Sequence, residues 1–212
     1  MATRQNELSN RRRAQRRNTR RRLLDAAHQL LEDRGWSDIS LEEIAVTAQV
    51  ARTAFYRYFE DRQHLLNAML EDVGLELDHV ADAWMNDPAG SDDSITDLRR
   101  SLAGLTEIFV NHGRLLQAIS DTARHDPDMG ERYQALADHL IAATADRIEK
   151  DIEAGRSRIE EPLEVARALT WMNERYLLAS FGHTPLADPA PVTRALTTIW
   201  VSTLYGPAGH DQ

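Results

Sequence analysis

The sequence predicts an all-α protein of about nine helices, with a small helical head at the N-terminus and a larger helical domain after it. Apolar residues recur every three or four positions through most of the 212 residues. No segment shows the two-residue alternation that is typical of a half-buried strand. Stretches that contain glycine and proline separate the periodic segments at spacings that suit helices. Together these three observations indicate a helical bundle rather than a mixed fold.

The head is predicted to contain three helices. The first runs from about Asn18 to Arg34, and residues 1–17 before it are expected to form a basic, flexible arm. Ser40 and Glu43 form a capping box, so the second helix should begin at Leu41. A tight turn then leads into a third, short helix.

That third helix covers residues 52–58. Phe55 and Phe59 lie one turn apart and should pack inward on the other helices of the head. Arg52 and Tyr56 share the opposite face. Apolar anchors behind and hydrogen-bond donors in front are the arrangement that a helix needs to bind in the DNA major groove.

The larger domain follows from the same periodicity. We expect a long helix from Arg62 past Trp84, a loop at Asn86–Ser94, and helices at Ile95 to about Gly113, Leu115–Arg124, Pro127 to Gly155, Pro162 to Gly182 and about Val192 to Tyr205. The predicted domains are therefore the arm at 1–17, a helix-turn-helix domain at 18–61 and a larger helical domain at 62–212.

The charge is unevenly distributed along the chain. Residues 1–70 contain 13 Arg and 9 acidic residues, whereas residues 71–212 contain 12 basic and 25 acidic residues. Within residues 1–22, nine Arg stand against one Glu. Such a run is also typical of a solvated tail, but its position directly before a helix-turn-helix pattern favours a site for a polyanion.

The composition bounds the remaining classes of protein. Hydrophobic residues make up 42% of the chain, which is enough for a core. The chain has no cysteine, which excludes disulfide bonds, thiolate nucleophiles and cysteine-ligated zinc. No apolar run has the length of a signal peptide or of a membrane span. We therefore expect a cytoplasmic protein with no membrane partner.

The head resembles the DNA-binding domain of TetR-type transcriptional repressors, and residues 54–62, AFYRYFEDR, match the motif closely. Gln49 stands where that family has a turn glycine, and Ala51 stands where it has a capping serine. Each departure costs about 1 kcal/mol. From the arm and the resemblance together, the predicted contacts to a double-stranded DNA operator are Arg12, Arg13, Arg16, Arg17, Ser40, Thr47, Arg52, Thr53, Tyr56, Tyr58 and Arg62.

The last two predicted helices carry broad apolar faces. Two such helices can form half of a four-helix interface, and a dimer on a pseudo-palindrome is what a single helix-turn-helix needs for useful specificity. We therefore predict a homodimer through these helices. The alternative that both complete the core of one chain stays open.

Residues 171–181, WMNERYLLASF, and residues 199–206, IWVSTLYG, resemble one actinobacterial subgroup of the family, the ethionamide-resistance repressors. In that subgroup an apolar channel with an Asn as its polar handle takes a ligand, which implies a small hydrophobic effector here. By position the handle is Asn173, unless a neighbouring group satisfies its amide. The predicted ligand-binding residues are Leu98, Leu105, Phe109, Tyr133, Ala137, Leu140, Thr144, Thr170, Trp171, Asn173 and Trp200.

An enzyme is the main competing class, and the residues do not favour it. None of the eight His stands three or four residues from another, as a helical metal pair would. The ten Gly form no nucleotide-binding or nucleophile motif, so we expect no metal and no cofactor. An Arg-rich RNA-binding protein would explain residues 11–22 but not the capped helix-turn-helix. We predict a ligand-responsive, homodimeric TetR-type regulator, specifically a repressor.

Overall fold

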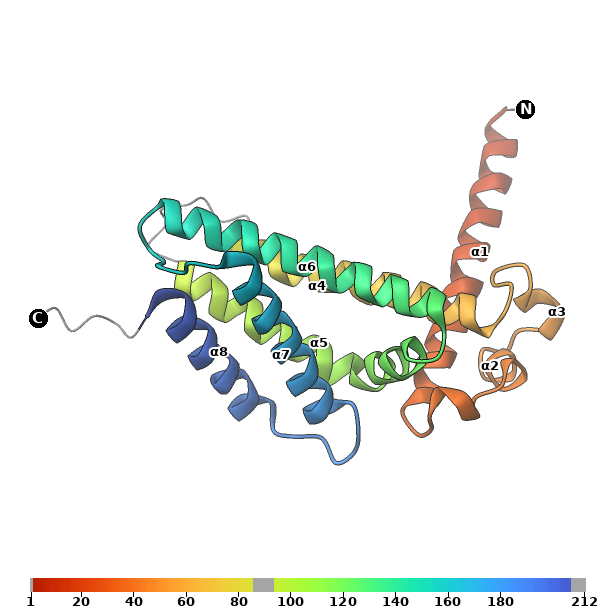
Figure 1. Ribbon diagram of the computed structural model, residues 1–212. Helices are drawn as coiled ribbons and strands as arrows, with labels where there is room; N and C mark the ends of the chain where they lie inside the picture. The colour runs from red at the N-terminus through yellow and green to blue at the C-terminus, as the bar shows by residue number, and fades with distance from the viewer. Residues whose placement is uncertain (1, 86–93, 207–212) are drawn as a thin grey trace, which may run out of the picture. The chain divides into compact units, whose positions relative to one another are not determined.

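A computed structural model describes residues 2–85 and 94–206, with side chains from Ala14 onward (Figure 1). This part of the chain contains eight α-helices, one short 3-10 helix and no β-strand. The all-α prediction is therefore confirmed. By its contacts the chain divides into two compact units, Met1–Met69 and Leu70–Gln212.

The first unit contains three helices and a 3-10 turn. In order these are α1 at Ala2–Leu31, η1 at Trp36–Asp38, α2 at Leu41–Thr47 and α3 at Arg52–Phe55. α1 packs against α2, and α2 packs against α3. Phe55 and Phe59 are buried in this core, as predicted, with their ring centroids 5.6 Å apart. The inward face of the unit is thus built by the apolar positions that the sequence pattern marks.

α1 begins earlier than the sequence predicts. It is continuous from Ala2 to Leu31, so the prediction of a helix start at Asn18 is wrong, while the predicted flexibility of the basic arm stays a prediction. The segment contains no glycine or proline, and Arg, Gln, Glu and Ala are all good helix formers. The arginine run is therefore carried on a helix.

The second unit is a bundle of five helices. These are α4 at Arg62–Met85, which begins in the first unit, α5 at Ser94–Ala123, α6 at Pro127–Glu153, α7 at Pro162–Phe181 and α8 at Pro189–Tyr205. α5 packs against α6, α7 and α8, and α7 lies beside both α6 and α8 (Figure 1). Of the predicted loop at residues 86–94, only Ser94 is described, and it begins α5.

Local signals set most helix ends in this unit. The carboxylate of Asp126 accepts a hydrogen bond from Met129 N at 2.9 Å, which caps α6 with Pro127 at its first position. After α6, Gly155 has a φ of 74°. Asp188 caps α8 in the same way, so this helix begins at Pro189 rather than near Val192.

One predicted break is absent. The sequence predicts that a helix ends near Gly113 and a short one follows, but α5 runs unbroken from Ser94 to Ala123. A Cβ at position 113 would collide with the carbonyl oxygen of Phe181 on α7. Gly113 therefore permits two helices to approach closely, and the bundle has one helix fewer than predicted. In the described part of the chain, no helix is both long and apolar enough to cross a membrane.

Candidate nucleic-acid interface and ligand cavity

The start of α2 is fixed by the predicted capping box. Glu43 N donates to Ser40 Oγ at 3.2 Å, and Ser40 N donates to Glu43 Oε2 at 2.8 Å. The pKa of Glu43 is lowered to about 2. The largest cause is the hydrogen bond from the Ser40 backbone, and the second largest is the hydrogen bond from Arg34. The hydroxyl of Ser40 also donates to Glu43, so a DNA contact by this residue would have to share the cap.

The turn after α2 has the left-handed backbone conformation that favours glycine, although Gln49 stands at this position. Gln49 has a φ of 52°, which is unfavourable for a residue with a side chain. Arg22 of α1 supports this turn, because its guanidinium donates to the carbonyl oxygens of Ala48 and, at 3.0 Å, of Gln49. The sequence shows Arg22 only as one member of an arginine run. Its anchoring role was therefore missed.

α3 is shorter than predicted. It covers four residues, and hydrogen bonds between residues three apart continue the turn to Tyr58. Ala51 precedes it without a side-chain cap, as its methyl group requires. Arg52, Thr53 and Tyr56 are exposed, whereas Phe55 is buried. Arg52 and Tyr56 interact with each other, so two of the predicted DNA contacts are neighbours on the surface and Thr53 is accessible next to Arg52 in the chain.

Arg52 has two neighbours on this surface. Its Nη1 lies 3.4 Å from Glu42 Oε2 in an ion pair that is well exposed on both sides. A hydrogen bond with Tyr56 is the main cause that raises the pKa of the Arg52 guanidinium, and the negative charge of Glu42 adds to it. Arg52 is therefore cationic. An ion pair that is this exposed to solvent is weak, so it does not hold Arg52 away from a phosphate or a base.

The other predicted DNA contacts differ in how accessible they are. Arg16 and Arg17 are exposed on α1, whereas Thr47 and Tyr58 are half-buried. The side chains of Arg12 and Arg13 lie outside the described residues. Arg62 Nη1 donates to the carbonyl oxygens of Trp36, at 2.9 Å, and of Ile39, and the guanidinium lies 5.1 Å from the Trp36 ring centroid.

Arg62 therefore joins the start of α4 to the segment before α2. The sequence predicts only a phosphate contact for it, and this contact stays a prediction. No signal in the sequence marks the anchoring role, because the carbonyl groups that Arg62 binds are more than twenty residues away along the chain.

A cavity of about 130 Å³ lies within the second unit, and all eleven predicted ligand-binding residues line it. Its wall also contains ten residues that were not predicted: Leu77, Val80, Ala81, Trp84, Met85, Ser101, Leu102, Leu116, Leu136 and Glu174. Five of these come from α4, a helix that the sequence reasoning treated only as a connector. The lining is largely apolar, which suits a ligand with a hydrocarbon body.

Asn173 is buried in the wall of this cavity, with 6% of its surface exposed. Trp200 Nε1 donates to its Oδ1 at 2.9 Å. Because an indole N–H can only donate, this bond fixes the orientation of the amide and leaves Nδ2 as the free donor. No hydrogen bond from Nδ2 occurs among the described residues, so the neighbour satisfies only half of the amide.

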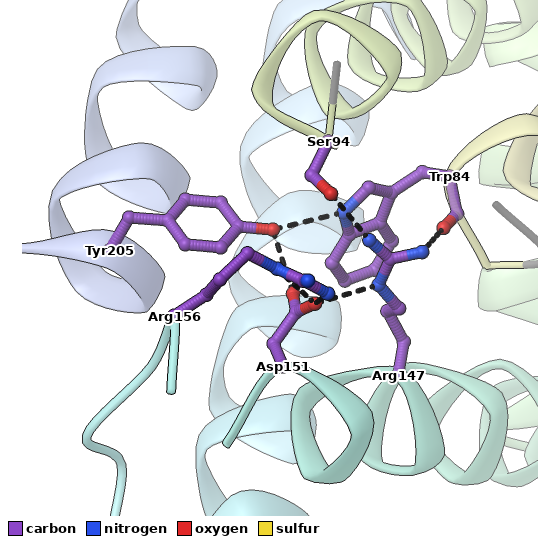
Figure 2. Close-up of polar contacts among 6 residues, drawn as sticks. All are labelled: Trp84, Ser94, Arg147, Asp151, Arg156 and Tyr205. Carbon is purple, nitrogen blue, oxygen red and sulfur yellow. Dashed lines mark hydrogen bonds and ion pairs between the residues drawn. The ribbon is translucent and has the colours of Figure 1, made fainter. Parts of the chain in front are cut away.

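A polar cluster lies at the end of the bundle where α4 ends and α5 begins (Figure 2). Arg147 and Asp151, both on α6, are 0% and 1% exposed and are joined at 3.2 Å. Arg147 also donates to Ser94 Oγ at 2.9 Å and to the carbonyl oxygen of Trp84. The guanidinium lies 5.4 Å from the centroid of the Trp84 ring. Three helices and a buried charge pair meet at this point.

The same cluster reaches α8. Tyr205 OH donates to Asp151 Oδ2 at 2.8 Å and accepts from Trp84 Nε1 at 3.2 Å, while Arg156 pairs with Asp151 from the other side (Figure 2). Burial is the main cause that raises the pKa of Tyr205 to about 12, and the negative charge of Asp151 adds to it. Trp84 packs edge-on against Trp200, the partner of Asn173, with centroids 5.8 Å apart.

Metal chemistry finds no support in the described residues, where no group of three or more His, Asp or Glu side chains could hold an ion. An exposed cationic helix after a tight turn, combined with an apolar cavity in a helical bundle, is typical of a ligand-binding transcriptional regulator.

Residues 23–69 match the domain of bacterial regulatory proteins of the tetR family, and residues 98–206 match the C-terminal domain of the transcriptional regulator EthR. The chain belongs to the TetR family of helix-turn-helix transcriptional regulators. This assignment confirms the resemblance found in the head and in the last two helices. It also decides against an enzyme, because the family consists of transcriptional regulators.

Individual relatives support the assignment over most of the chain. The HTH-type transcriptional regulator EthR of Mycobacterium tuberculosis is 32% identical over 186 residues, which are 87% of this chain and 86% of that protein. The EthR of Mycolicibacterium smegmatis is 29% identical over 190 residues, 87% and 85% of the two chains. The crystal structure of NalD, the secondary repressor of the MexAB-OprM multidrug efflux pump in Pseudomonas aeruginosa, has a TM-score of 0.70 at 23% identity. It covers 92% of this chain and 98% of that one, and shows the shared fold.

Proposed function

We propose that this regulator is a repressor that binds a pseudo-palindromic operator as a homodimer and is released by a small apolar ligand. TetR regulators bind DNA as dimers and take small-molecule ligands. The observation that carries the proposal for this chain is the pairing of the exposed Arg52, Thr53 and Tyr56 surface with a cavity in the other unit. A cytoplasmic location follows from an operator in the bacterial chromosome.

The DNA-binding step is supported by charge and exposure. The first 70 residues carry a net positive charge on a chain whose total is −9. Arg16 and Arg17 would contact the phosphate backbone from α1, and Arg52 and Tyr56 would contact base edges. A good bidentate base contact contributes about 1–3 kcal/mol to discrimination. Replacing both reading side chains should therefore weaken specific binding by roughly tenfold or more.

The test uses the DNA directly upstream of this gene as the probe. The double variant Arg52→Ala with Tyr56→Phe should bind it roughly tenfold or more weakly in a fluorescence anisotropy titration. Arg167→Ala removes an exposed arginine from the second unit and is the charge-matched control. Unchanged affinity in the double variant would refute the assignment of the reading face.

The arginine run is tested separately by salt dependence. The slope of log affinity against log salt should fall by about 0.9 for each phosphate contact that is lost. Deleting residues 1–17 removes six of the nine arginines of residues 1–22, among them Arg16 and Arg17, and leaves the buried part of α1. If the slope of the truncated protein equals that of the full chain, the run does not contact DNA.

The dimer is supported by apolar side chains that α7 and α8 leave exposed. Leu163 and Tyr176 on α7 and Ile199 on α8 are large apolar side chains that are 48%, 40% and 41% exposed. A second copy of the same pair of helices would cover them in a four-helix interface. Tyr176→Asp with Ile199→Asp should therefore yield monomers in analytical ultracentrifugation. Leu75→Asp, at a still more exposed apolar site on α4, should remain dimeric.

The ligand step rests on the cavity and on Asn173. The free Nδ2 donor of this residue would bind an acceptor such as a ligand carbonyl or hydroxyl, while the apolar wall surrounds the hydrocarbon body. Asn173→Leu should weaken the ligand response and leave operator affinity unchanged. Loss of DNA binding in this variant would instead mark Asn173 as a structural partner of Trp200.

Coupling between the two sites would pass along α4. Its residues Leu77, Val80 and Trp84 line the cavity, while its first residue, Arg62, is anchored to the carbonyl groups before α2. A ligand that prefers the non-binding form of the dimer about 100-fold supplies about 2.7 kcal/mol toward release. The ligand thus needs only a modest preference to control the operator.

A further inference from the structure

The described wall of the cavity contains one charged side chain. Among the described residues that line it, Glu174 alone has an acidic or basic side chain, and the others are aliphatic, aromatic or neutral polar groups. Glu174 is half-buried, and a ligand that fills the cavity would remove its carboxylate further from water, which costs several kcal/mol unless the carboxylate is paired or well hydrogen-bonded. The way in which this carboxylate is satisfied therefore indicates what the cavity accepts.

Tyr133 provides a hydrogen-bond donor for one of the two oxygens of the Glu174 carboxylate. The phenol OH donates to Glu174 Oε1 at 2.7 Å, from α6 to α7. Burial, followed by the negative charge of Glu174, raises the pKa of Tyr133, so the phenol stays a neutral donor at all physiological pH values. This bond holds the carboxylate at the cavity wall. It does not neutralise the charge.

No cation of the described chain neutralises it either. No ion pair of Glu174 occurs among the described residues, although its neighbours on α7 do form such pairs, as Glu164 does with Arg167 at 3.5 Å. Arg124 acts on Tyr133 electrostatically, but its guanidinium is exposed and pairs with Asp121 at 3.3 Å. The carboxylate is left with a charge and an acceptor oxygen, Oε2, for which the described chain provides no partner.

The rest of the wall suits a cation. Five aromatic side chains line the cavity: Trp84, Phe109, Tyr133, Trp171 and Trp200. Aromatic ring faces attract a desolvated ammonium group, and a carboxylate attracts it more strongly. On the polar side, the Nδ2 donor of Asn173 repels a cation but binds a neutral acceptor. Glu174 and Asn173 thus favour different parts of one molecule.

We propose that the effector is a lipophilic amine whose protonated nitrogen binds Glu174, with its apolar body in the cavity and, where it has one, a neutral acceptor at Asn173. This inference rests on the proposed function, since it names the chemical class of the ligand for the same cavity. A neutral fatty or aromatic ligand would bury the carboxylate without a counter-ion. An anionic ligand would be repelled by it.

The experiment compares two compounds that differ in one group, 4-phenylbutylamine and 4-phenylbutan-1-ol. The amine is protonated at pH 7, because its pKa resembles that of a lysine side chain, about 10.4. Binding to the full-length protein is measured by isothermal titration calorimetry and by the fluorescence of the cavity tryptophans. The amine should bind about ten- to hundredfold more tightly than the alcohol, as expected for a charge-assisted hydrogen bond.

Glu174→Gln should abolish this preference and leave the affinity for the alcohol within about threefold of the unmodified protein. The matched control, Glu164→Gln, removes the same charge from an exposed position on the same helix and should retain the preference. Unchanged operator binding of the variant shows that it is folded. The comparison of amine and alcohol affinities in the unmodified protein tests the preference for a cation without any variant.

The outcomes separate the two proposals. If the alcohol binds and the amine binds no more tightly, the cation site is refuted while the apolar cavity remains a ligand site. A preference that survives Glu174→Gln also refutes it. If neither compound binds, both the amine inference and the proposal of an apolar effector site fail.

Discussion

The buried pair of Arg147 and Asp151 allows a quantitative prediction of stability. Asp151→Asn keeps the shape of the side chain but removes its charge. Arg147 would then be a fully buried cation that has lost its ion pair with Asp151 and keeps its hydrogen bonds to the Trp84 carbonyl and Ser94 Oγ. Breaking a buried pair by removing one partner costs about 3–5 kcal/mol. For a chain of this size, that loss lowers the melting temperature by roughly 6–20 °C.

The assay is thermal and urea denaturation followed by circular dichroism. All proteins are compared at one concentration, because dimer formation makes the midpoint depend on it. Glu164→Gln breaks the exposed pair with Arg167 and should cost less than about 1 kcal/mol. Arg147→Met combined with Asp151→Asn should recover part of the loss, since no unpaired buried charge remains.

The result that refutes this reasoning is a loss below about 1 kcal/mol for Asp151→Asn. Such a value would mean that water reaches the pair and that the cluster at the ends of α4, α6 and α8 is not a dry, coupled unit. A double variant that is less stable than Asp151→Asn would also contradict it.

Three further predictions concern single positions. Ala51→Ser restores the missing cap of α3 and should raise the free energy of unfolding by about 1 kcal/mol in urea denaturation; no gain would mean that the hydroxyl does not reach the helix start. Gly113→Ala forces a methyl group against the Phe181 carbonyl and should lower stability by about 1–3 kcal/mol, whereas an unaffected midpoint would show that α5 and α7 separate freely. The folded-state pKa of Tyr205 is raised to about 12 from an ordinary value of 10.0, so its contribution to stability should be complete below pH 10 and lost as the pH rises toward 12. In pH-dependent denaturation, Tyr205→Phe should flatten this decline relative to the unmodified protein, and an identical decline would exclude the phenol as its source.

Local signals were sufficient to predict much of the fold. The capping box at Ser40, the Asp126–Pro127 helix start and the positive φ of Gln49 depend on neighbours within a few residues, so the sequence alone contains them. Helical periodicity and family resemblance together also selected eleven residues that line one cavity. Their ligand contacts remain predictions.

The misplaced elements have a different cause. The local sequence predicts that a helix ends at Gly113. The actual role of this glycine is set by the backbone of Phe181, which is nearly seventy residues away in the chain. The sequence shows Arg22 only as a member of the arginine run and predicts a phosphate contact for Arg62. Arg22 instead donates to carbonyl groups of the turn after α2, and Arg62 donates to carbonyl groups of the segment before α2. The Glu174 carboxylate could not be recognised, because its significance depends on which side of α7 faces the cavity.

The central claim is that a ligand in the cavity controls operator binding, and fluorescence anisotropy of labelled upstream DNA tests it most directly. The protein is titrated onto the DNA with and without saturating 4-phenylbutan-1-ol, and ligand occupancy is followed by tryptophan fluorescence. The ligand should weaken DNA binding, by about 100-fold if its preference for the non-binding form is of that size. Asn173→Leu should bind DNA normally and respond less. A protein that is saturated with ligand and binds the DNA with unchanged affinity would contradict the account.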